Sequence, residues 1–205
     1  GACSGVTLEN LILLNPGKQN QGSYQQLLEV FGSKGLDDGT LSISDLTIRG
    51  CWFMQHYDTG GDDLMYMRAS VGEVLIENNV FGPGNGPGGA DRPAVQIGTQ
   101  HGPQPKNTFP ETRDVVIRNN IFAGLRGDAA LGVSNSEWTW VYNNVFYANS
   151  GSKTRSVIMI RGNKYTPNNI HVVNNVFDSN MPTKNGGDLY WLRDTLMPEA
   201  FQYDY

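Results

Sequence analysis

The eight-residue phrase Val74-Leu75-Ile76-Glu77-Asn78-Asn79-Val80-Phe81 recurs along this 205-residue sequence, with six copies in all. Three further copies keep the Asn-Asn pair in place, and two looser copies keep only the pattern of apolar residues. Self-similarity of this kind is the sequence signature of a repeat architecture. The other close copies begin at Val115, Thr139 and Ile170, and the looser ones begin at Val6 and Leu46.

Each copy has the pattern of a strand, a corner and a second strand. Apolar and polar residues alternate, which is β-strand periodicity, so Val74 and Ile76 would point inward and Glu77 outward. The Asn-Asn pair then predicts a sharp corner, because asparagine tolerates the left-handed backbone conformation and bonds to its own main chain. Successive copies start between 24 and 41 residues apart. Such variation indicates constant rungs joined by loops of different lengths.

A second family of apolar segments lies between the copies, one in each repeat. Each rung would therefore contain a strand, an Asn corner, a short strand, a loop and a third strand. Stacked rungs of this kind pair in parallel and bury a continuous column of side chains. The second family consists of Leu27–Phe31, Leu64–Arg68, Ala94–Gly98, Ala130–Ser134, Val157–Arg161 and Leu189–Arg193.

The repeats predict an all-β chain that forms a single domain over residues 1–205, as a solenoid of about six rungs. A propeller would need four antiparallel strands per blade, and a leucine-rich repeat would need a regular Leu frame that is absent here. Two columns of stacked side chains are expected, one of phenylalanine rings and one of asparagine amides. The expected aromatic stack contains Phe53, Phe81, Phe122, Phe146 and Phe177, and the expected hydrogen-bonded ladder contains Asn78, Asn119, Asn143 and Asn174.

The Ile-x-Asn-Asn-x-Phe rung resembles the right-handed parallel β-helix superfamily, which has the pectate-lyase-like fold. The resemblance covers roughly residues 6–193. It is specific for the fold and unspecific for activity, because lyases, glycosidases, phage spikes and structural proteins share the fold. In lyase-like members the strand before the long turn forms the sugar groove with its loops. The resemblance thus implies that the second family is the groove strand and that the protein is secreted or at the cell surface.

The outward positions of the second family form two columns when the inward apolar pairs are aligned. One column contains Tyr66 and Trp191, and the other contains Arg68, Arg161 and Arg193. Aromatic rings stack on sugar faces, and guanidinium groups pair bidentately with a uronate or a sulfate. These five residues are the candidate substrate-binding site for an acidic polysaccharide. The alternative is a solvated sheet face whose arginines pair with nearby carboxylates.

Acidic residues on Gly-rich turns lead into these strands and form the candidate metal site. Stacked rung upon rung, such carboxylates could give Ca²⁺ its oxygen ligands. The lyase resemblance implies that Ca²⁺ or a base neutralises the uronate while a Lys or Arg removes the C5 proton. No compact Asp–Lys–Arg group stands out, so catalytic residues are unknown, and the Gly-Asp pairs could simply make turns. The acidic residues are Asp62, Asp63, Asp91 and Asp188.

The composition of the sequence argues against some classes of binding partner and against a disulfide scaffold. The formal net charge is −5 with only 15 Lys and Arg, which argues against nucleic acid, because phosphate neutralisation needs clustered cations. No apolar run approaches the roughly 20 residues of a membrane span. The two cysteines, Cys3 and Cys51, are too few for a disulfide scaffold. Both a bridge between them and two buried free thiols remain open.

The ends of the solenoid suggest a second class of function. Terminal rungs expose unpaired amides and the end of the core, so they normally need caps. Nothing before Val6 could form a capping helix, whereas residues 194–205 could cover the last rung or contact another protein. We therefore expect an extracellular protein that binds or acts on an acidic polysaccharide, lyase-like if it is an enzyme. The alternative is a structural protein that stacks head to tail into a filament, or a segment of a larger β-helix protein.

Overall fold

In the part of the chain that it describes, the computed structural model contains nineteen β-strands and no helix. The described residues are 2–15, 26–32, 39–55, 63–83, 93–99, 109–147, 153–162, 165–178, 190–193 and 201–203. For residues 15, 55, 126–128, 153–155, 190–193 and 201–203 the structure describes the backbone but not the side chains.

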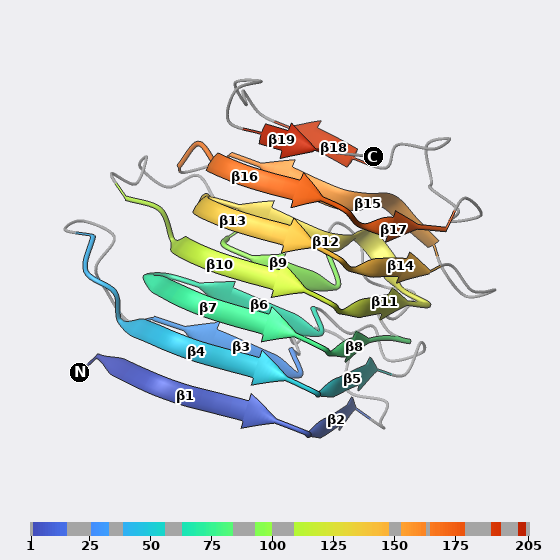
Figure 1. The fold of residues 1–205 in the computed structure, drawn as a ribbon, viewed down its shortest axis with the longest axis horizontal. Coiled ribbons are helices and arrows are strands. Elements are labelled where there is room, and N and C mark those ends of the chain that lie inside the picture. Colours follow the sequence, from blue (N-terminus) through green and yellow to red (C-terminus); the bar gives the residue numbers. More distant parts are fainter. Residues whose placement is uncertain are drawn as a thin grey trace, which may run out of the picture.

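Three parallel sheets run along the molecule, and each takes one strand from every rung (Figure 1). Sheet A contains, in spatial order, β1 (Cys3–Glu9), β4 (Ile43–Arg49), β7 (Val71–Glu77), β10 (Thr112–Arg118), β13 (Ser136–Tyr142), β16 (Asn168–Val173) and β19 (Phe201–Tyr203). Sheet B contains β2 (Ile12–Asn15), β5 (Trp52–Gln55), β8 (Val80–Phe81), β11 (Ile121–Ala123), β14 (Val145–Tyr147) and β17 (Val176–Phe177). Sheet C contains β3 (Leu28–Phe31), β6 (Met65–Arg68), β9 (Val95–Ile97), β12 (Arg126–Ser134), β15 (Lys153–Arg161) and β18 (Tyr190–Arg193).

The chain passes from sheet A to sheet B to sheet C in each rung, and each strand then pairs with its equivalent in the next rung. This is the predicted parallel β-helix, and its six rungs correspond to the six copies of the repeated phrase. One strand goes beyond six rungs: Phe201 of β19 pairs with Ile170 of β16, so part of the tail stacks on the last rung. That is the placement expected of a capping tail.

The predicted phenylalanine stack runs through the core. Phe53, Phe81, Phe122, Phe146 and Phe177 follow one another with ring centroids 4.9, 5.0, 4.7 and 5.1 Å apart. These separations match the roughly 4.8 Å between neighbouring strands, so each ring sits directly on the ring of the rung before it. The first four rings are fully buried. Offset stacking of buried rings adds to the apolar area that the stack removes from water.

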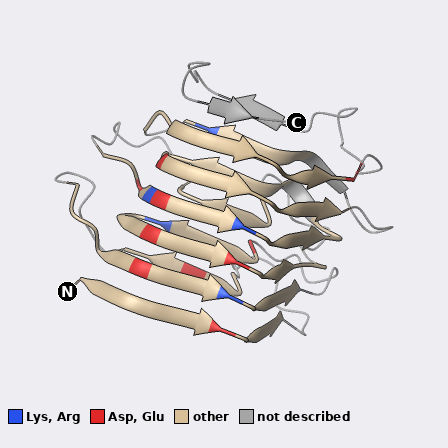
Figure 2. Ribbon diagram, viewed as in Figure 1, with Lys and Arg blue, Asp and Glu red and all other residues tan. Residues whose placement is uncertain are grey.

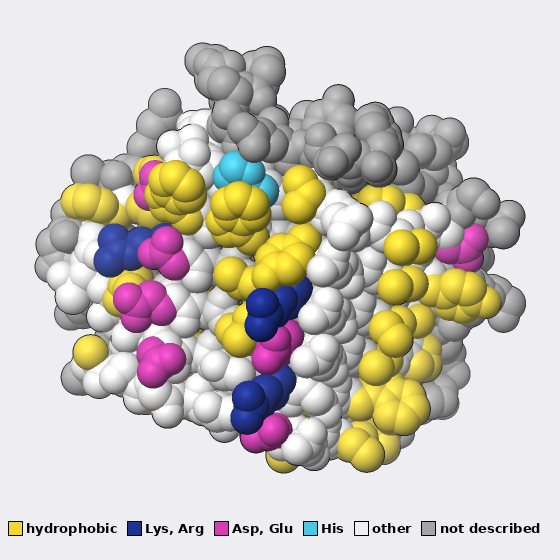
Figure 3. All heavy atoms as spheres, viewed as in Figure 1, with side chains coloured by type: hydrophobic (Ala, Val, Ile, Leu, Met, Phe, Trp, Pro, Cys, Tyr) yellow, Lys and Arg dark blue, Asp and Glu magenta, His cyan; other side chains and the backbone are white. Residues whose placement is uncertain are grey.

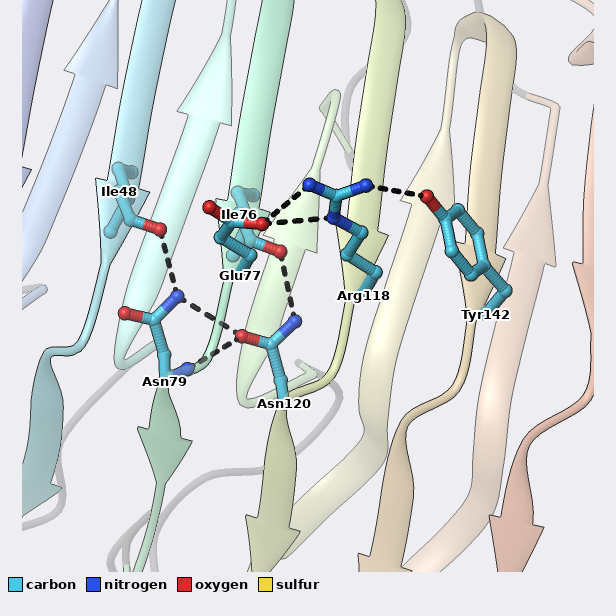
Figure 4. A network of polar contacts seen from close by, with 7 residues as sticks. All are labelled: Ile48, Ile76, Glu77, Asn79, Arg118, Asn120 and Tyr142. Carbon is cyan, nitrogen blue, oxygen red and sulfur yellow. Dashed lines mark hydrogen bonds and ion pairs between the residues drawn. The ribbon is translucent and has the colours of Figure 1, made fainter.

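The asparagine ladder exists, but its buried members are the second asparagine of each pair. Asn79 Nδ2 donates to Asn120 Oδ1 at 3.0 Å (Figure 4). Asn120 Nδ2 in turn donates to Asn144 Oδ1 at 3.0 Å. Asn144 Nδ2 continues the ladder to Asn175 Oδ1 at 2.9 Å. Of the predicted links between first asparagines, the structure has the exposed one from Asn174 Nδ2 to Asn143 Oδ1 at 2.7 Å, so the prediction was right about one link and placed the buried ladder one residue too early.

Backbone conformation explains why the two asparagines of a pair differ. The first has a φ near +55° in all four close copies and is exposed, at Asn78, Asn119, Asn143 and Asn174. Asparagine is among the few side chains that tolerate this region, so its task is to turn the chain. The turn then directs the second side chain into the molecule.

In the second rung Gly50 and Cys51 replace the Asn pair. Gly50 takes the left-handed conformation, with φ +62°, and the Cys51 backbone N–H donates to Asn79 Oδ1 at 2.9 Å. The buried Cys51 thiol lies 3.3 Å from the Arg49 carbonyl oxygen, while Cys3 is exposed. Both cysteines are free. The alternative of a bridge is therefore wrong, and of the expected buried thiols only Cys51 is buried.

Sheet A is longer than the repeated phrase and carries a kink. In all six rungs a residue with positive φ precedes the phrase and drops out of the strand pairing; β7, for example, starts at Val71 and has its kink at Glu73. Six positions of this kind are stacked along the sheet; all are exposed except the last, which is half-buried. They are Gly5, Asp45, Glu73, Asp114, Trp138 and Asn169.

One column of charged residues near the ends of the sheet A strands alternates in sign along the sheet (Figure 2). Arg49 pairs with Glu9 at 3.1 Å, and Arg118 pairs with Glu77 at 2.7 Å. Arg118 also donates to the Tyr142 hydroxyl at 3.1 Å (Figure 4), and these two neighbours raise the pKa of its guanidinium. Exposed pairs contribute little stability each. Within this column the alternation keeps like charges off neighbouring strands, where they would oppose the stacking, whereas three neighbouring kink positions of the same sheet are acidic.

Candidate functional site

The outer face of sheet C carries the predicted site columns. Tyr66 pairs in register with Gln96, and Met159 pairs with Trp191, in one column. Arg161 pairs with Arg193 in the other. All five candidate residues therefore stand on the sheet and in the columns that the sequence predicts. The side chains of Trp191 and Arg193 lie outside the described part of the structure.

Arg68 is held by its own neighbours at one end of the sheet. Its Nη2 donates to Glu29 Oε1 at 2.9 Å. Its guanidinium carbon lies 4.6 Å from the Phe31 ring centroid and 5.0 Å from the Tyr66 ring centroid. A cation over aromatic faces gains electrostatic stabilisation. The Glu29 carboxylate therefore balances the charge of Arg68. This agrees with the alternative prediction that the arginines of this face pair with nearby carboxylates.

Tyr66 lies on the outer side of sheet C, but the residue is only 7% exposed. The expected open aromatic platform is therefore not found at this position. Burial is the main cause that raises the pKa of the phenol, while a hydrogen bond with Thr99 and the nearby Arg68 lower it. Contact of Tyr66 with a ligand stays a prediction.

A buried polar network beside Tyr66 was missed by sequence reasoning. The Thr99 backbone N–H donates to Glu111 Oε2 at 2.7 Å, and Asn135 Nδ2 donates to the Thr99 carbonyl at 2.8 Å. Asn135 Oδ1 accepts the Tyr165 backbone N–H at 2.9 Å. Asn135 has φ +48° directly after the apolar strand β12. An asparagine at a strand end was the available signal for this second corner.

The middle of the face is covered. Gln96 and Ser134 point outward yet are 1% and 0% exposed, and neither Gln96 Oε1 nor Ser134 Oγ has a hydrogen-bond partner. A Cβ on Gly132 would lie 2.4 Å from Pro93 Cγ, so Pro93 packs directly on the sheet. The half-buried arginines Arg68 and Arg161 flank this covered middle. Toward β3 the face is open, with Phe31 54% exposed, whereas on β15 the aromatic column is still covered at Met159, which is 0% exposed.

Arg161 and Arg193 stand directly opposite each other on β15 and β18. Neighbouring parallel strands lie about 4.8 Å apart, so the backbone places the two arginines at one register position of the sheet. Arg161 also interacts with another group of the protein. Guanidinium groups on neighbouring strands can pair with the same oxyanion.

The metal prediction can be examined at only one of its four residues. Asp63 is 1% exposed, and its Oδ1 has no hydrogen bond although other groups contact the residue. The other three, Asp62, Asp91 and Asp188, lie outside the described residues. Within the described part, no group of three His, Cys, Asp or Glu side chains could hold a metal ion. Calcium binding therefore stays a prediction and carries no step below.

Comparison with known proteins leaves the function to be argued from geometry. The chain matches no family model, no curated protein and no solved structure. Where the structure is described, no helix is long and apolar enough to cross a membrane.

Proposed function

We propose that this chain is an extracellular β-helix protein that binds an acidic polysaccharide on the outer face of sheet C. The observation that carries the proposal is the facing pair Arg161 and Arg193, in the same column as Arg68. A polymer with a carboxylate or sulfate on each sugar would offer anions along the column. Guanidinium groups bind such anions through two parallel hydrogen bonds.

We also propose a superfamily for this chain. The Asn-Asn corner, the ladder behind it and three parallel sheets support membership of the pectate-lyase-like superfamily. In that superfamily the strand corresponding to sheet C lines the sugar groove. Fold alone does not fix activity. We therefore propose binding, with lyase chemistry as the form that any catalysis would take.

A glycan panel tests this function. Polygalacturonate and a sulfated glycan are expected to bind, and neutral dextran is not. Arg161→Ala should weaken binding by about ten-fold or more, because a hydrogen bond to a charged group contributes roughly 1.5–3 kcal/mol. The effect should shrink as salt screens the charge. Arg49→Ala is the matched control, since Arg49 is an exposed arginine on sheet A. No binding by the parent protein, or equal weakening by both substitutions, would refute the proposal.

A structural role is the second candidate, and the first rung favours it. β1, β2 and β3 are the outermost described strands of their sheets. Val6, Leu8 and Leu13 are only partly buried, whereas their second-rung equivalents Leu46, Ile48 and Phe53 are 3%, 0% and 0% exposed. Unpaired strand edges beside an open core can add further strands. A second copy, or another part of a longer chain, would complete this rung. Filaments in electron micrographs of the pure protein would support the stacking of copies.

A further inference from the structure

The outer face of sheet B is apolar in every rung. One column of outward side chains is in register from β2 to β17 and contains only aliphatic residues and tryptophan. Figure 3 shows these hydrophobic side chains as a column that runs along the sheet B strands. The column, called here the sheet B column, consists of Ile12, Trp52, Val80, Ile121, Val145 and Val176.

Neighbouring outward residues widen the column. Leu14 and Met54 share a register position at one end, and Ala123 and Tyr147 share one further along. Asp178 follows β17 and closes this second row. No other charge stands among the outward side chains that the structure describes on these strands, so the face offers water almost nothing to hydrogen-bond.

The exposed area is too large for an ordinary free surface. Seven large side chains of the face are between 38% and 68% exposed, from Val145 to Ile12. At about 200 Å² for a fully exposed large side chain, they leave roughly 700 Å² of mostly apolar surface in water. Contiguous apolar patches on monomers rarely exceed a few hundred Å². The area also approaches the roughly 800 Å² that each partner contributes to a stable interface.

We propose that the sheet B column is a dimer interface and that its occupant is a second copy of this chain. The match in area supports this occupant, and so does the near absence of charge, since no complementary charge is needed for the face to pair with itself. Two sheets packed face to face lie about 10 Å apart with their strands within about 30°. A twofold axis makes such a contact closed and symmetric.

The order of residue sizes favours one orientation of the two copies. With the axis crossing the column between Val80 and Ile121, the first rung faces the last. Ile12 then meets Val176, Trp52 meets Val145, and Val80 meets Ile121, so that each contact joins a larger and a smaller side chain. Packing of this kind fills the contact evenly. The opposite orientation would place tryptophan on tryptophan in one rung and valine on valine in three others.

This interface is independent of the glycan proposal. Sheet C forms a different side of the solenoid, so a dimer through sheet B does not cover the column of Arg68 and Arg161. It also differs from head-to-tail stacking, which would use the terminal strands and leave sheet B exposed. The proposals of a dimer, a glycan site and a filament can therefore each be refuted without refuting the other two.

Sedimentation equilibrium of the full chain tests the proposal. The parent protein is expected to be a dimer at micromolar concentrations. Ile121→Lys and Val145→Lys should each raise the dimer dissociation constant at least ten-fold, because each would bury a charge at the twofold contact. Trp140→Lys is the matched control: Trp140 is 38% exposed, as Val145 is, but lies on sheet A. It should leave the dimer unchanged.

The outcomes separate the possible explanations. Circular dichroism of each variant reports whether it folds, and Tyr147→Glu supplies a further substitution at a 53% exposed position if a column variant does not. A parent protein that stays monomeric at about 100 micromolar would overturn the proposal. So would an oligomer that folded column variants leave intact, since its contact would then lie elsewhere, at the open ends or on sheet A.

Discussion

Asn79, Asn120 and Asn144 show how one side chain can join three rungs. Asn120 Nδ2 donates to the Ile76 carbonyl of the rung before, at 3.0 Å, and to Asn144 Oδ1 of the rung after. Asn120 Oδ1 accepts both the backbone N–H and the side-chain amide of Asn79. The residue is 1% exposed. Water is not positioned to replace these bonds, so the amide has to be present for the corner to be satisfied.

Asn120→Ala should therefore destabilise the protein strongly. Loss of the amide leaves the Ile76 carbonyl and the Asn79 N–H buried and unpaired, at about 1–3 kcal/mol for each group. Asn119→Gly is the matched control, because Asn119 is exposed with φ +55° and glycine accepts that backbone freely. Urea unfolding should show a clear loss for Asn120→Ala and little change for Asn119→Gly. The reverse order would mean that the first asparagine is the structural one.

At the scale of the element, the kink in sheet A singles out Trp138. Neighbouring rungs place Asp114 and Asn169 at this position, and such short polar side chains tolerate positive φ. Trp138 adopts φ +53° with 46% of its surface exposed. A bulky residue in this region is strained. Burial offsets only part of that strain, because nearly half of the residue's surface remains in water.

Trp138→Asn is expected to keep or raise the free energy of unfolding, by up to about 1 kcal/mol, since the left-handed region costs an ordinary residue roughly 1–2 kcal/mol. Trp140→Asn should lower it, because Trp140 stacks on His171 with centroids 3.9 Å apart. Thermal melts of the two variants provide the comparison. A larger loss from Trp138→Asn than from Trp140→Asn would show that packing of the Trp138 ring outweighs its strain.

The sequence was informative about elements and less so about what surrounds them. Alternation of apolar and polar residues reveals which side of a strand faces inward, so the Phe stack and the outward columns of sheet C were predictable. It does not reveal what covers the outer side, which is why the burial of Tyr66 and Gln96 was not foreseen. The repeated phrase likewise located the corner at Asn-Asn. Which of the two side chains turns inward depends on the backbone angle φ of the first asparagine, which the amino-acid sequence alone does not specify.

For the whole molecule, the central claim is that rungs distant in sequence stack in register. Leu75 and Val116 lie 41 residues apart in the chain but are partners on the outer side of sheet A. Thr47 also pairs with Leu75, from the opposite side, so it lies two strands from Val116. Neighbouring strands are about 4.8 Å apart, within the roughly 4.4–6.8 Å between Cα atoms that a disulfide spans. Two strands exceed that span.

Cysteine pairs at these positions test the stacking most directly, in a background where the exposed Cys3 is replaced by Ser and the buried Cys51 is kept. Under mild oxidation and titration of free thiols, Leu75→Cys with Val116→Cys should close into a disulfide in the folded monomer. Thr47→Cys with Val116→Cys should keep both thiols free. Closure of the second pair in place of the first would contradict the register, and with it the stacked parallel β-helix.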